Sequence, residues 1–308
     1  MKKKCVIFAY SSIGYECLEE LIVQGLDAAA VFTHEDDPGE EKWFRSVGEL
    51  AEKNRIPVRT PGKLGDAETQ QIREIRPDII FSFSYRKIIP VSILDLAPSG
   101  AFNIHCALLP RYRGRACVNW AVLNGESETG VTLHHMTARV DEGRIVDREA
   151  VPINPDDTAY DVFEKLIPAA RKMLRRSLPS ILAGTARGYE QDESGATYFG
   201  RRRPEDGRIH WRKPAREIYN LVRAVTHPFP GAFTFSGGRK LFVWDARPHD
   251  GEANVPGIVV SSSPLIVGTG AGSLKIGRAQ WEGEAESGGD ELGLPEGAVL
   301  GKGGGGTS

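Results

Sequence analysis

Three side chains between residues 101 and 147 have the chemistry that acyl transfer needs. Asn103 and His105 are two residues apart, and Asp141 follows a loop rich in Gly and Arg and an apolar run. An amide can stabilise a developing oxyanion, an imidazole can carry a proton near neutral pH, and a carboxylate can orient and charge-balance the imidazole. Each of these residue types is common in structural roles, so type and spacing alone predict only an α/β enzyme with a proton-transfer site.

The first part of the chain alternates short apolar runs with helical patterns. Residues 5–10 and 28–34 are apolar runs of the kind that fully covered parallel strands show, and residues 15–24 between them have helical periodicity. The alternation continues in four more predicted elements, which are helices at 43–54 and 67–75 and strands at 56–60 and 78–85. This pattern predicts an α/β domain with a doubly wound, mostly parallel sheet.

Ligands of such sheets bind beyond the carboxyl ends of the strands. Residues 11–14, 34–41, 85–87 and 103–105 each follow a strand-like run, so we expect them to meet at one edge. The first strand is not followed by GxGxxG, and the chain contains no Walker motif, which argues against classical dinucleotide or P-loop binding.

A hairpin is predicted around Asp141. Strand-like residues 131–136 and 148–154 flank it and place Asp141 at or near the turn. A long helix at 159–182 follows, with residues 156–158 as its N-cap region. The basic residues of this helix are expected to form a solvated face, and they are Arg171, Lys172, Arg175 and Arg176.

The composition changes near residue 198. After a helix-like segment at 215–225, several short strand-like runs are each bounded by Gly, Pro or Ser, which predicts a small β barrel or sandwich. We place the domain boundary near residue 203. The predicted division is a catalytic domain at 1–203, a second domain at 204–300 and a disordered glycine-rich end at 301–308.

Length and composition are those of an ordinary globular chain. The 308 residues are 40% hydrophobic and 26% charged with a formal net charge of −2, so no overall basic field favours a polyanion partner. The four cysteines lack metal-site spacing and are expected to be reduced thiols in a cytoplasmic protein. The basic start is interpreted as leading into a buried strand and not as a signal peptide, and no run has the roughly 20 apolar residues of a membrane-spanning helix.

The motifs around the three candidate residues resemble those of the formyltetrahydrofolate-dependent formyltransferases. The similarity lies in NIH at 103–105, LLPRYRG at 108–114 and DEG at 141–143, and it extends over nearly the whole chain. It implies a Rossmann-like N-terminal domain with a small OB-like β-barrel domain after it. It also implies that Asn103, His105 and Asp141 are the catalytic trio, that 10-formyltetrahydrofolate is the formyl donor, and that no metal is needed.

The resemblance also suggests binding residues. The folate is expected beside the loop after the 78–85 strand and before the glycine of the DEG motif, at Tyr85, Arg86, Lys87, Ile88 and Gly143. Guanidinium groups pair well with phosphate oxygens, so a nucleotide sugar is expected to contact an aromatic residue and four arginines, namely Tyr112, Arg113, Arg115, Arg201 and Arg202.

Within the family, segments such as YFGRRRPEDGRIHW are most similar to enzymes that formylate UDP-4-amino-4-deoxy-L-arabinose in lipid A modification, which confers polymyxin resistance. The alternatives are another nucleotide amino sugar such as a dTDP-4-amino sugar, a methionyl-tRNA formyltransferase, and a non-catalytic folate- or nucleotide-binding module. A tRNA partner requires basic loops, whereas the tract at 34–41 is mostly acidic and forms either a solvated loop or a specificity lid. We expect no nucleic-acid partner and no membrane insertion; the sequence does not indicate the oligomeric state.

Two residues depart from the family pattern. Ala107 stands where a Ser usually precedes the Leu-Leu-Pro, and Cys117 stands where a Pro usually follows the arginine-glycine element. Ala107 lacks the hydroxyl of serine and Cys117 lacks the rigid turn of proline, so the sequence does not establish that the loop after His105 is rigid.

Overall fold

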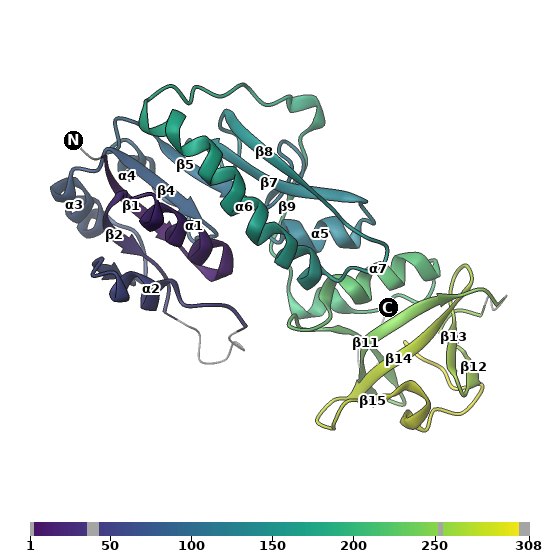
Figure 1. Ribbon diagram of the computed structural model, residues 1–308. Helices are drawn as coiled ribbons and strands as arrows, with labels where there is room; N and C mark the ends of the chain where they lie inside the picture. The colour runs from purple at the N-terminus through teal and green to yellow at the C-terminus, as the bar shows by residue number, and fades with distance from the viewer. Residues whose placement is uncertain (1–2, 36–42, 252–254, 302–308) are drawn as a thin grey trace. The chain divides into compact units, whose positions relative to one another are not determined.

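The computed structural model describes residues 3–35, 43–251 and 255–301 (Figure 1). The chain divides into two compact units. The first unit consists of Met1–Cys117, Glu128–Pro152 and Phe163–Gly200, and the second of Val118–Ser127, Ile153–Val162 and Arg201–Ser308. Most of the predicted disordered end and residues 36–42 of the acidic tract lie outside the described residues.

The first unit is built on a seven-stranded sheet in the order β3-β2-β1-β4-β5-β7-β8. Its strands are β1 Lys4–Ala9, β2 Asp27–Phe32, β3 Val58–Arg59, β4 Ile79–Phe83, β5 Ala101–His105, β7 Glu128–His135 and β8 Ile145–Pro152. Pairings from β3 to β5 are parallel, whereas β7 pairs antiparallel with both β5 and β8. The predicted Rossmann-like, mostly parallel sheet is therefore confirmed, with an antiparallel hairpin added at one edge.

The helices of this unit are α1 Ser11–Val23, α2 Val47–Lys53, α3 Asp66–Ile75, α4 Val91–Leu94 and most of α6 Ala159–Leu182. Helix α5 Cys117–Leu123 lies almost entirely in the second unit. One face of the sheet packs Val6 and Phe8 of β1 against Ile72 of α3 and Ile93 of α4. Burial on both faces explains why β1 and β4 are continuous apolar runs. The predicted N-cap of α6 is also present, because the Thr158 hydroxyl accepts from the backbone N–H of Asp161 at 3.1 Å.

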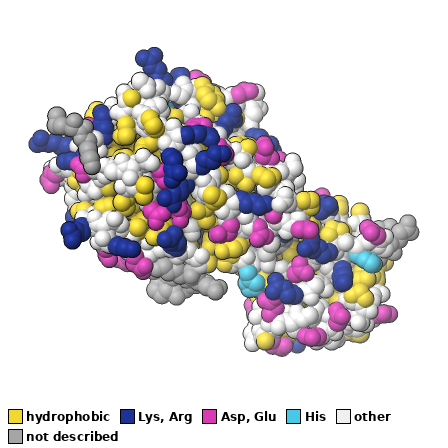
Figure 2. Space-filling model, viewed as in Figure 1, with side chains coloured by type: hydrophobic (Ala, Val, Ile, Leu, Met, Phe, Trp, Pro, Cys, Tyr) yellow, Lys and Arg dark blue, Asp and Glu magenta, His cyan; other side chains and the backbone are white. Residues whose placement is uncertain are grey.

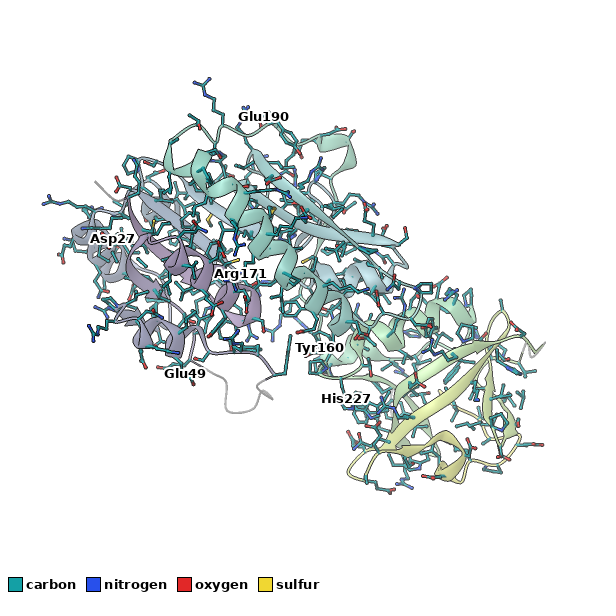
Figure 3. All side chains as sticks on the ribbon, in the orientation of Figure 1. Asp27, Glu49, Tyr160, Arg171, Glu190 and His227 are labelled. Carbon is teal, nitrogen blue, oxygen red and sulfur yellow. The ribbon has the colours of Figure 1, made fainter. Side chains whose placement is uncertain are left out.

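The basic residues of α6 are ion-paired and do not form the simple solvated face that the sequence predicted. Arg171 contacts Glu16, Glu19 and Glu20 of α1, and Arg175 also contacts Glu20. Lys172 and Arg176 pair with acidic residues of β8. Figure 3 shows Arg171 between the two helices, and in Figure 2 dark blue and magenta side chains alternate over them. Helical periodicity places these cations on one face but does not reveal which element carries the anions.

The fully buried Glu20 is the centre of this cluster. Arg175 and Arg171 hold the pKa of its carboxyl at about 2, against the opposing effect of burial. We expect Glu20→Gln to lower the free energy of unfolding by about 2 kcal/mol at pH 7, because charged hydrogen bonds are lost and two arginines remain beside a neutral group. Glu19→Gln is the control, since Glu19 is partly exposed and pairs with Arg171 alone among the described side chains.

Urea unfolding of Glu20→Gln, Glu19→Gln and the unmodified protein at several pH values is the measurement. A carboxyl with a depressed folded pKa stabilises the fold above its unfolded pKa and loses that contribution as the pH falls. The difference between the unmodified protein and Glu20→Gln should therefore be full at pH 7 and shrink between the ordinary glutamate pKa of about 4.3 and the folded value of about 2. A difference that does not change over this interval would contradict the role given to the Glu20 charge.

The second unit contains α7 Ala215–Val225 and an antiparallel sheet. Its strands are β10 Ala232–Ser236, β11 Arg239–His249, β12 Val259–Ser262, β13 Leu265–Gly268, β14 Ser273–Trp281 and β15 Ser287–Gly288, in the order β10-β11-β14-β13-β12 with β15 beside β14. Single bridges join Leu300 to Ser236, at the end of the β10 edge, and Val299 to Ile258, next to β12. The chain thus connects both edges of the sheet, in keeping with the expected small β domain.

Two early segments of the chain also belong to the second unit, which the predicted boundary at 203 did not anticipate. The Asn119 side chain donates to the carbonyl of Ala224 at 2.8 Å, and the guanidinium of Arg223 donates to the carbonyls of Val122 and Asp157. These hydrogen bonds tie 118–127 and 153–162 to α7. Across the described ranges, the structure contains no helix long and apolar enough to cross a membrane.

Candidate active site

Strand β5 and its neighbour β7 place the first two candidate residues. Asn103 and His105 lie inside β5 and not after it as the sequence suggested, and their spacing of two directs both side chains to one face of the sheet. Residue His134 of β7 lies directly opposite Asn103 in the antiparallel register. A polar cluster is therefore built from cross-strand neighbours.

His105 is held between two acceptors. Its Nε2 donates to the carbonyl oxygen of Tyr112 at 2.7 Å, and its Nδ1 lies 3.5 Å from Oδ2 of Asp141. The ring is 7% exposed, and burial by itself lowers its pKa. The Asp141 carboxylate, the Cys117 side chain and the Tyr112 carbonyl outweigh burial and raise the pKa of His105 to about 10. The imidazole is thus protonated at neutral pH.

Asp141 lies in the connection between β7 and β8, as the predicted hairpin required. Its backbone has a φ of 60°, an uncommon conformation for a residue with a side chain. Oδ2 accepts from the backbone N–H of Gly114 at 2.9 Å, and Oδ1 lies 3.6 Å from Nε2 of His134. Burial opposes the charge of the carboxylate, but His105 and this N–H keep its pKa below the ordinary value.

His134 is a site residue that the sequence reasoning missed. Its Nδ1 donates to the carbonyl of His135 at 2.8 Å, and its Nε2 lies 3.1 Å from the Asn103 amide nitrogen. A carbonyl can only accept, so Nδ1 carries a proton and Nε2 can accept from the Asn103 N–H. The amide of Asn103 is thereby oriented and retains a second N–H for another acceptor.

The loop after His105 is fixed although it has Ala107 and Cys117 at the two departing positions. The Thr132 hydroxyl of β7 donates to the Ala107 carbonyl at 2.6 Å and accepts from the Leu109 N–H at 3.1 Å. Cys117 is buried, and the neighbouring Cys106 together with burial raises the pKa of its thiol. Contacts from β7 and from His105 therefore hold this loop without the serine and the proline.

Two short strands hold the far end of this loop. Strand β6 Arg113–Gly114 pairs with β9 Tyr198–Phe199. The ring of Tyr112 stacks on Phe199 with 4.8 Å between centroids, and its N–H donates to the Thr197 hydroxyl. The described contacts of Tyr112 thus support the loop, while its predicted contact with a substrate remains untested.

Arg113 does not face outward as a phosphate-binding residue would. It is fully buried, and its guanidinium donates to Gln191 Oε1, to both carboxylate oxygens of Glu193 and to the Tyr198 hydroxyl. We therefore revise its expected role from substrate contact to support of the loop. Arg115, two positions further along the chain, is exposed, and no feature of the sequence distinguishes it from the buried Arg113.

The residues predicted for folate surround the carboxyl end of β4. Tyr85 stacks on His34 at 4.3 Å, and its buried hydroxyl has no hydrogen-bond partner among the residues that the structure describes. The Arg86 N–H donates to His34 Nε2 at 3.0 Å, and Lys87 Nζ donates to the carbonyl of Pro61. Ile88 is 72% exposed and offers an apolar surface. The expected meeting of the segments after β2 and β4 is therefore observed.

Gly143 is required by the backbone packing. A Cβ at this position would lie 1.8 Å from the carbonyl oxygen of His135, so no other residue fits without moving β7. Close approach of two chain segments therefore accounts for the glycine of the DEG motif. Any contact of Gly143 with folate would be made by its backbone.

The remaining arginines fall in different places. Arg115 is exposed, and its guanidinium donates to the Arg86 carbonyl at 3.1 Å, which links two predicted binding loops. Arg201 and Arg202 belong to the second unit. There Arg202 lies over the Trp120 ring at 4.7 Å and donates to the Asp206 carbonyl. Within the described part of the chain, its buried Nε has no hydrogen-bond partner.

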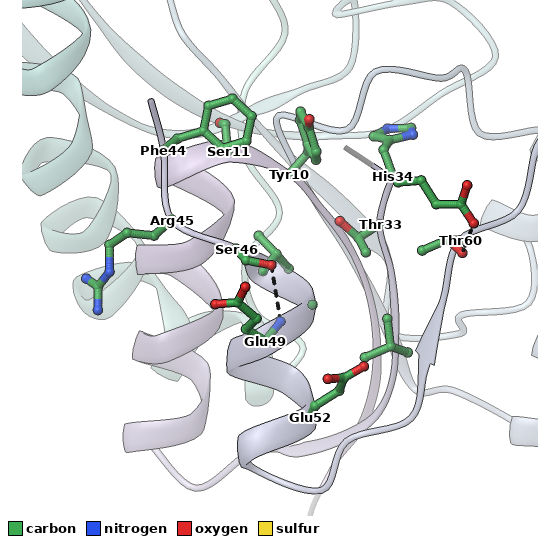
Figure 4. Close-up of a pocket in the computed structure, with 14 residues that line it drawn as sticks. Tyr10, Ser11, Thr33, His34, Phe44, Arg45, Ser46, Glu49, Glu52 and Thr60 are labelled. Carbon is green, nitrogen blue, oxygen red and sulfur yellow. Dashed lines mark hydrogen bonds between the residues drawn. The ribbon is translucent and has the colours of Figure 1, made fainter. Parts of the chain in front are cut away.

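A cavity of about 200 Å³ lies beyond the ends of β1 and β2 (Figure 4). Its lining includes Tyr10, Ser11, Thr33, His34 and Ser46, and none of the catalytic candidates. Burial, with Lys87 and Arg86 nearby, lowers the pKa of His34 to about 4, so this ring is neutral at pH 7. Among the described side chains, no group of three or more His, Cys, Asp or Glu residues could hold a metal ion.

Comparison with known proteins agrees with this arrangement. An N-formyltransferase from Helicobacter canadensis, solved with folinic acid and dTDP-3-aminofucose, has a TM-score of 0.73 at 23% identity, covering 90% of this chain and 99% of that one. WlaRD, a sugar 3N-formyl transferase solved with dTDP and 5-N-formyl-THF, has a TM-score of 0.68 at 22% identity, covering 92% and 100%. A 4-N formyltransferase from Francisella tularensis has a TM-score of 0.59 at 21% identity, covering 73% and 89%.

These structural likenesses establish the fold. The family follows from the sequence itself: residues 2–178 match the formyl transferase family, and residues 202–293 match the formyl transferase C-terminal domain. The first match alone covers more than half of the 308 residues. The chain therefore belongs to the formyl transferase family.

Proposed function

We propose that this protein transfers a formyl group from 10-formyltetrahydrofolate to the amine of a nucleotide-linked amino sugar. The observation that supports it most directly is the convergence of Asn103, His105 and Asp141 in one buried cluster of a formyl transferase fold. A folate donor is supported by two structurally similar proteins, which were solved with folinic acid and with 5-N-formyl-THF.

The cluster has the groups that this reaction needs. As the amine nitrogen attacks the formyl carbon, negative charge develops on the formyl oxygen, where the free N–H of Asn103 and the protonated His105 can stabilise it. When the bond from the formyl carbon to the folate nitrogen breaks, that nitrogen gains a proton from His105. The attacking amine loses one proton, which the His105–Asp141 pair takes up, so the protons balance over the cycle.

The acceptor sugar has two candidates. The similarity of the motifs supports UDP-4-amino-4-deoxy-L-arabinose, the substrate of the formyltransferase domain of ArnA. The solved neighbours favour a dTDP-linked amino sugar, since one was crystallised with dTDP-3-aminofucose and another with dTDP. Phosphates of either nucleotide suit an exposed guanidinium such as that of Arg115.

A formyl-transfer assay with 10-formyltetrahydrofolate and three acceptors in parallel tests this function. The acceptors are UDP-4-amino-4-deoxy-L-arabinose, a dTDP-amino sugar and charged initiator tRNA. We expect turnover with a nucleotide sugar only; turnover with tRNA alone would overturn the proposal. Thermal stabilisation by UMP against dTMP distinguishes the two bases, since a ligand that binds only the native state raises its apparent stability.

A further inference from the structure

A buried polar bridge lies behind the Asp141 loop, and one of its two members, Gln191, belongs to neither the motifs nor the predicted site. It consists of Gln191 and Arg113, which are 8% and 0% exposed and 78 residues apart in the chain. Buried amides and guanidinium groups are costly unless all their donors and acceptors are paired. The hydrogen-bond partners of these two side chains therefore indicate the role of the bridge.

The Gln191 amide makes four hydrogen bonds. Nε2 donates to the carbonyl of Asp141 at 2.7 Å and to the carbonyl of Gly143 at 2.8 Å. Oε1 accepts from Nε and Nη2 of Arg113 at 3.1 Å and 2.8 Å. The amide orientation is unambiguous, because carbonyls face its nitrogen and guanidinium donors face its oxygen.

Both ends of the bridge reach the backbone that contacts the His105–Asp141 pair. Gln191 fixes the backbone on each side of Glu142, and hence the strained residue Asp141. Arg113 lies between the Tyr112 carbonyl, which accepts from His105, and the Gly114 N–H, which donates to the Asp141 carboxylate. One buried amide thus connects the two loops that hold the catalytic pair.

We propose that Gln191 is a positioning residue for formyl transfer, because it holds the Asp141 loop against the loop that binds His105. This inference rests on the proposed function for its kinetic consequence, but the geometry it describes is a property of the protein without substrate. Loss of the Nε2 donor would release two carbonyls and let the loop relax from its positive φ. Asp141 would then move away from His105.

The experiment uses two variants, Gln191→Met and Gln191→Glu. Methionine removes the donor to the two carbonyls without adding a charge, so it carries the titration test. Glutamate keeps an acceptor for Arg113 but adds a carboxylate, which acts to raise the pKa of His105. In the protein without substrate, NMR titration of His105 reports the strength of its contact with Asp141. The other titratable groups close to the pair are Cys117, which lies beside His105, and His134, which faces Asp141 from β7. Neither is altered by the substitutions.

In Gln191→Met we expect the pKa of His105 to fall by about one pH unit or more, since a departing carboxylate stabilises the imidazolium less. In steady-state assays kcat should fall about 10- to 100-fold with little change in KM for the sugar, because a small displacement of a catalytic group affects the reaction more than binding. Gln71→Glu, on the exposed face of α3, is the matched control and should change neither quantity.

Each outcome is decisive. A folded Gln191→Met with an unchanged His105 titration overturns the inference, whatever its kcat. Failure of both variants to fold would assign the bridge to general stability and also overturn it. If the unmodified protein formylates no sugar while the His105 pKa falls as expected, the proposed function fails and the positioning geometry stands.

Discussion

Replacing His105 with alanine is expected to lower kcat for sugar formylation by about 10³-fold or more. General acid–base catalysis and oxyanion stabilisation are each worth factors of this order, and His105 is placed to supply both. The ring is protonated at neutral pH, because the carboxylate of Asp141 raises its pKa to about 10 despite burial. Alanine removes the proton donor and leaves Asn103 as the remaining donor to the formyl oxygen.

Single-turnover kinetics with saturating folate and sugar measure this effect without interference from product release. His105→Gln is a useful second variant, because glutamine retains a hydrogen-bond donor but cannot titrate. His210→Ala, at an exposed position of the second unit, is the control for a histidine removed elsewhere. If formyl transfer by folded His105→Ala were unchanged, the chain would be a binding module that retains the fold, and the catalytic assignment would be lost.

Local sequence signals predicted the turn that carries Asp141, although they placed Asn103 and His105 after a strand and not inside it. The spacing of Asn103 and His105 along β5 places them on one face, and the flanking strand patterns placed Asp141 at the hairpin between β7 and β8. The helix at 159–182 was predicted with its observed bounds, because its periodicity and its cap are both local. Threonine is a preferred N-cap residue, so the cap at Thr158 can be recognised from the sequence.

The parts that were not predicted depend on pairings between distant segments. His134 joins the site only through the register in which β7 pairs with β5, and no local pattern specifies that register. Gln191 lies in irregular chain, where no periodicity marks a buried residue. Arg113 has a side chain suited to phosphate binding, and only its contacts with Gln191 and Glu193 show that it supports a loop.

These non-local contacts explain how an unusual charge arrangement persists in the first unit. A buried imidazolium beside a buried carboxylate is costly unless geometry and hydrogen bonds are well fixed. Here the Tyr112 carbonyl and the Gly114 N–H satisfy the outer sides of the His105–Asp141 pair. The same loop is bound to β7 through Thr132 and to β9 through Arg113. The rigidity of the scaffold therefore sets the protonation state of His105.

Asp141→Asn tests this link between geometry and charge, and we expect it to lower kcat at pH 7 by about 10²- to 10³-fold. Asparagine is nearly isosteric but neutral, so burial becomes the main influence on His105 and its pKa falls from about 10 to below the ordinary value of about 6.5. At pH 7 the variant would then have a neutral imidazole and a weaker proton donor.

The pH dependence distinguishes this explanation from simple disruption of the loop. For a histidine whose folded pKa is raised, the favourable pairing is complete below the unfolded pKa and is lost as the pH rises through the folded value. In the unmodified protein His105 should therefore stay protonated up to about pH 10, whereas in Asp141→Asn it loses its proton at a lower pH. The rate of the unmodified protein divided by the rate of the variant should therefore decrease as the pH is reduced. Rate profiles over pH, with exposed Asp95→Asn as the control, measure this ratio. A ratio that does not vary with pH would show that Asp141 acts through loop structure and not through the charge of His105.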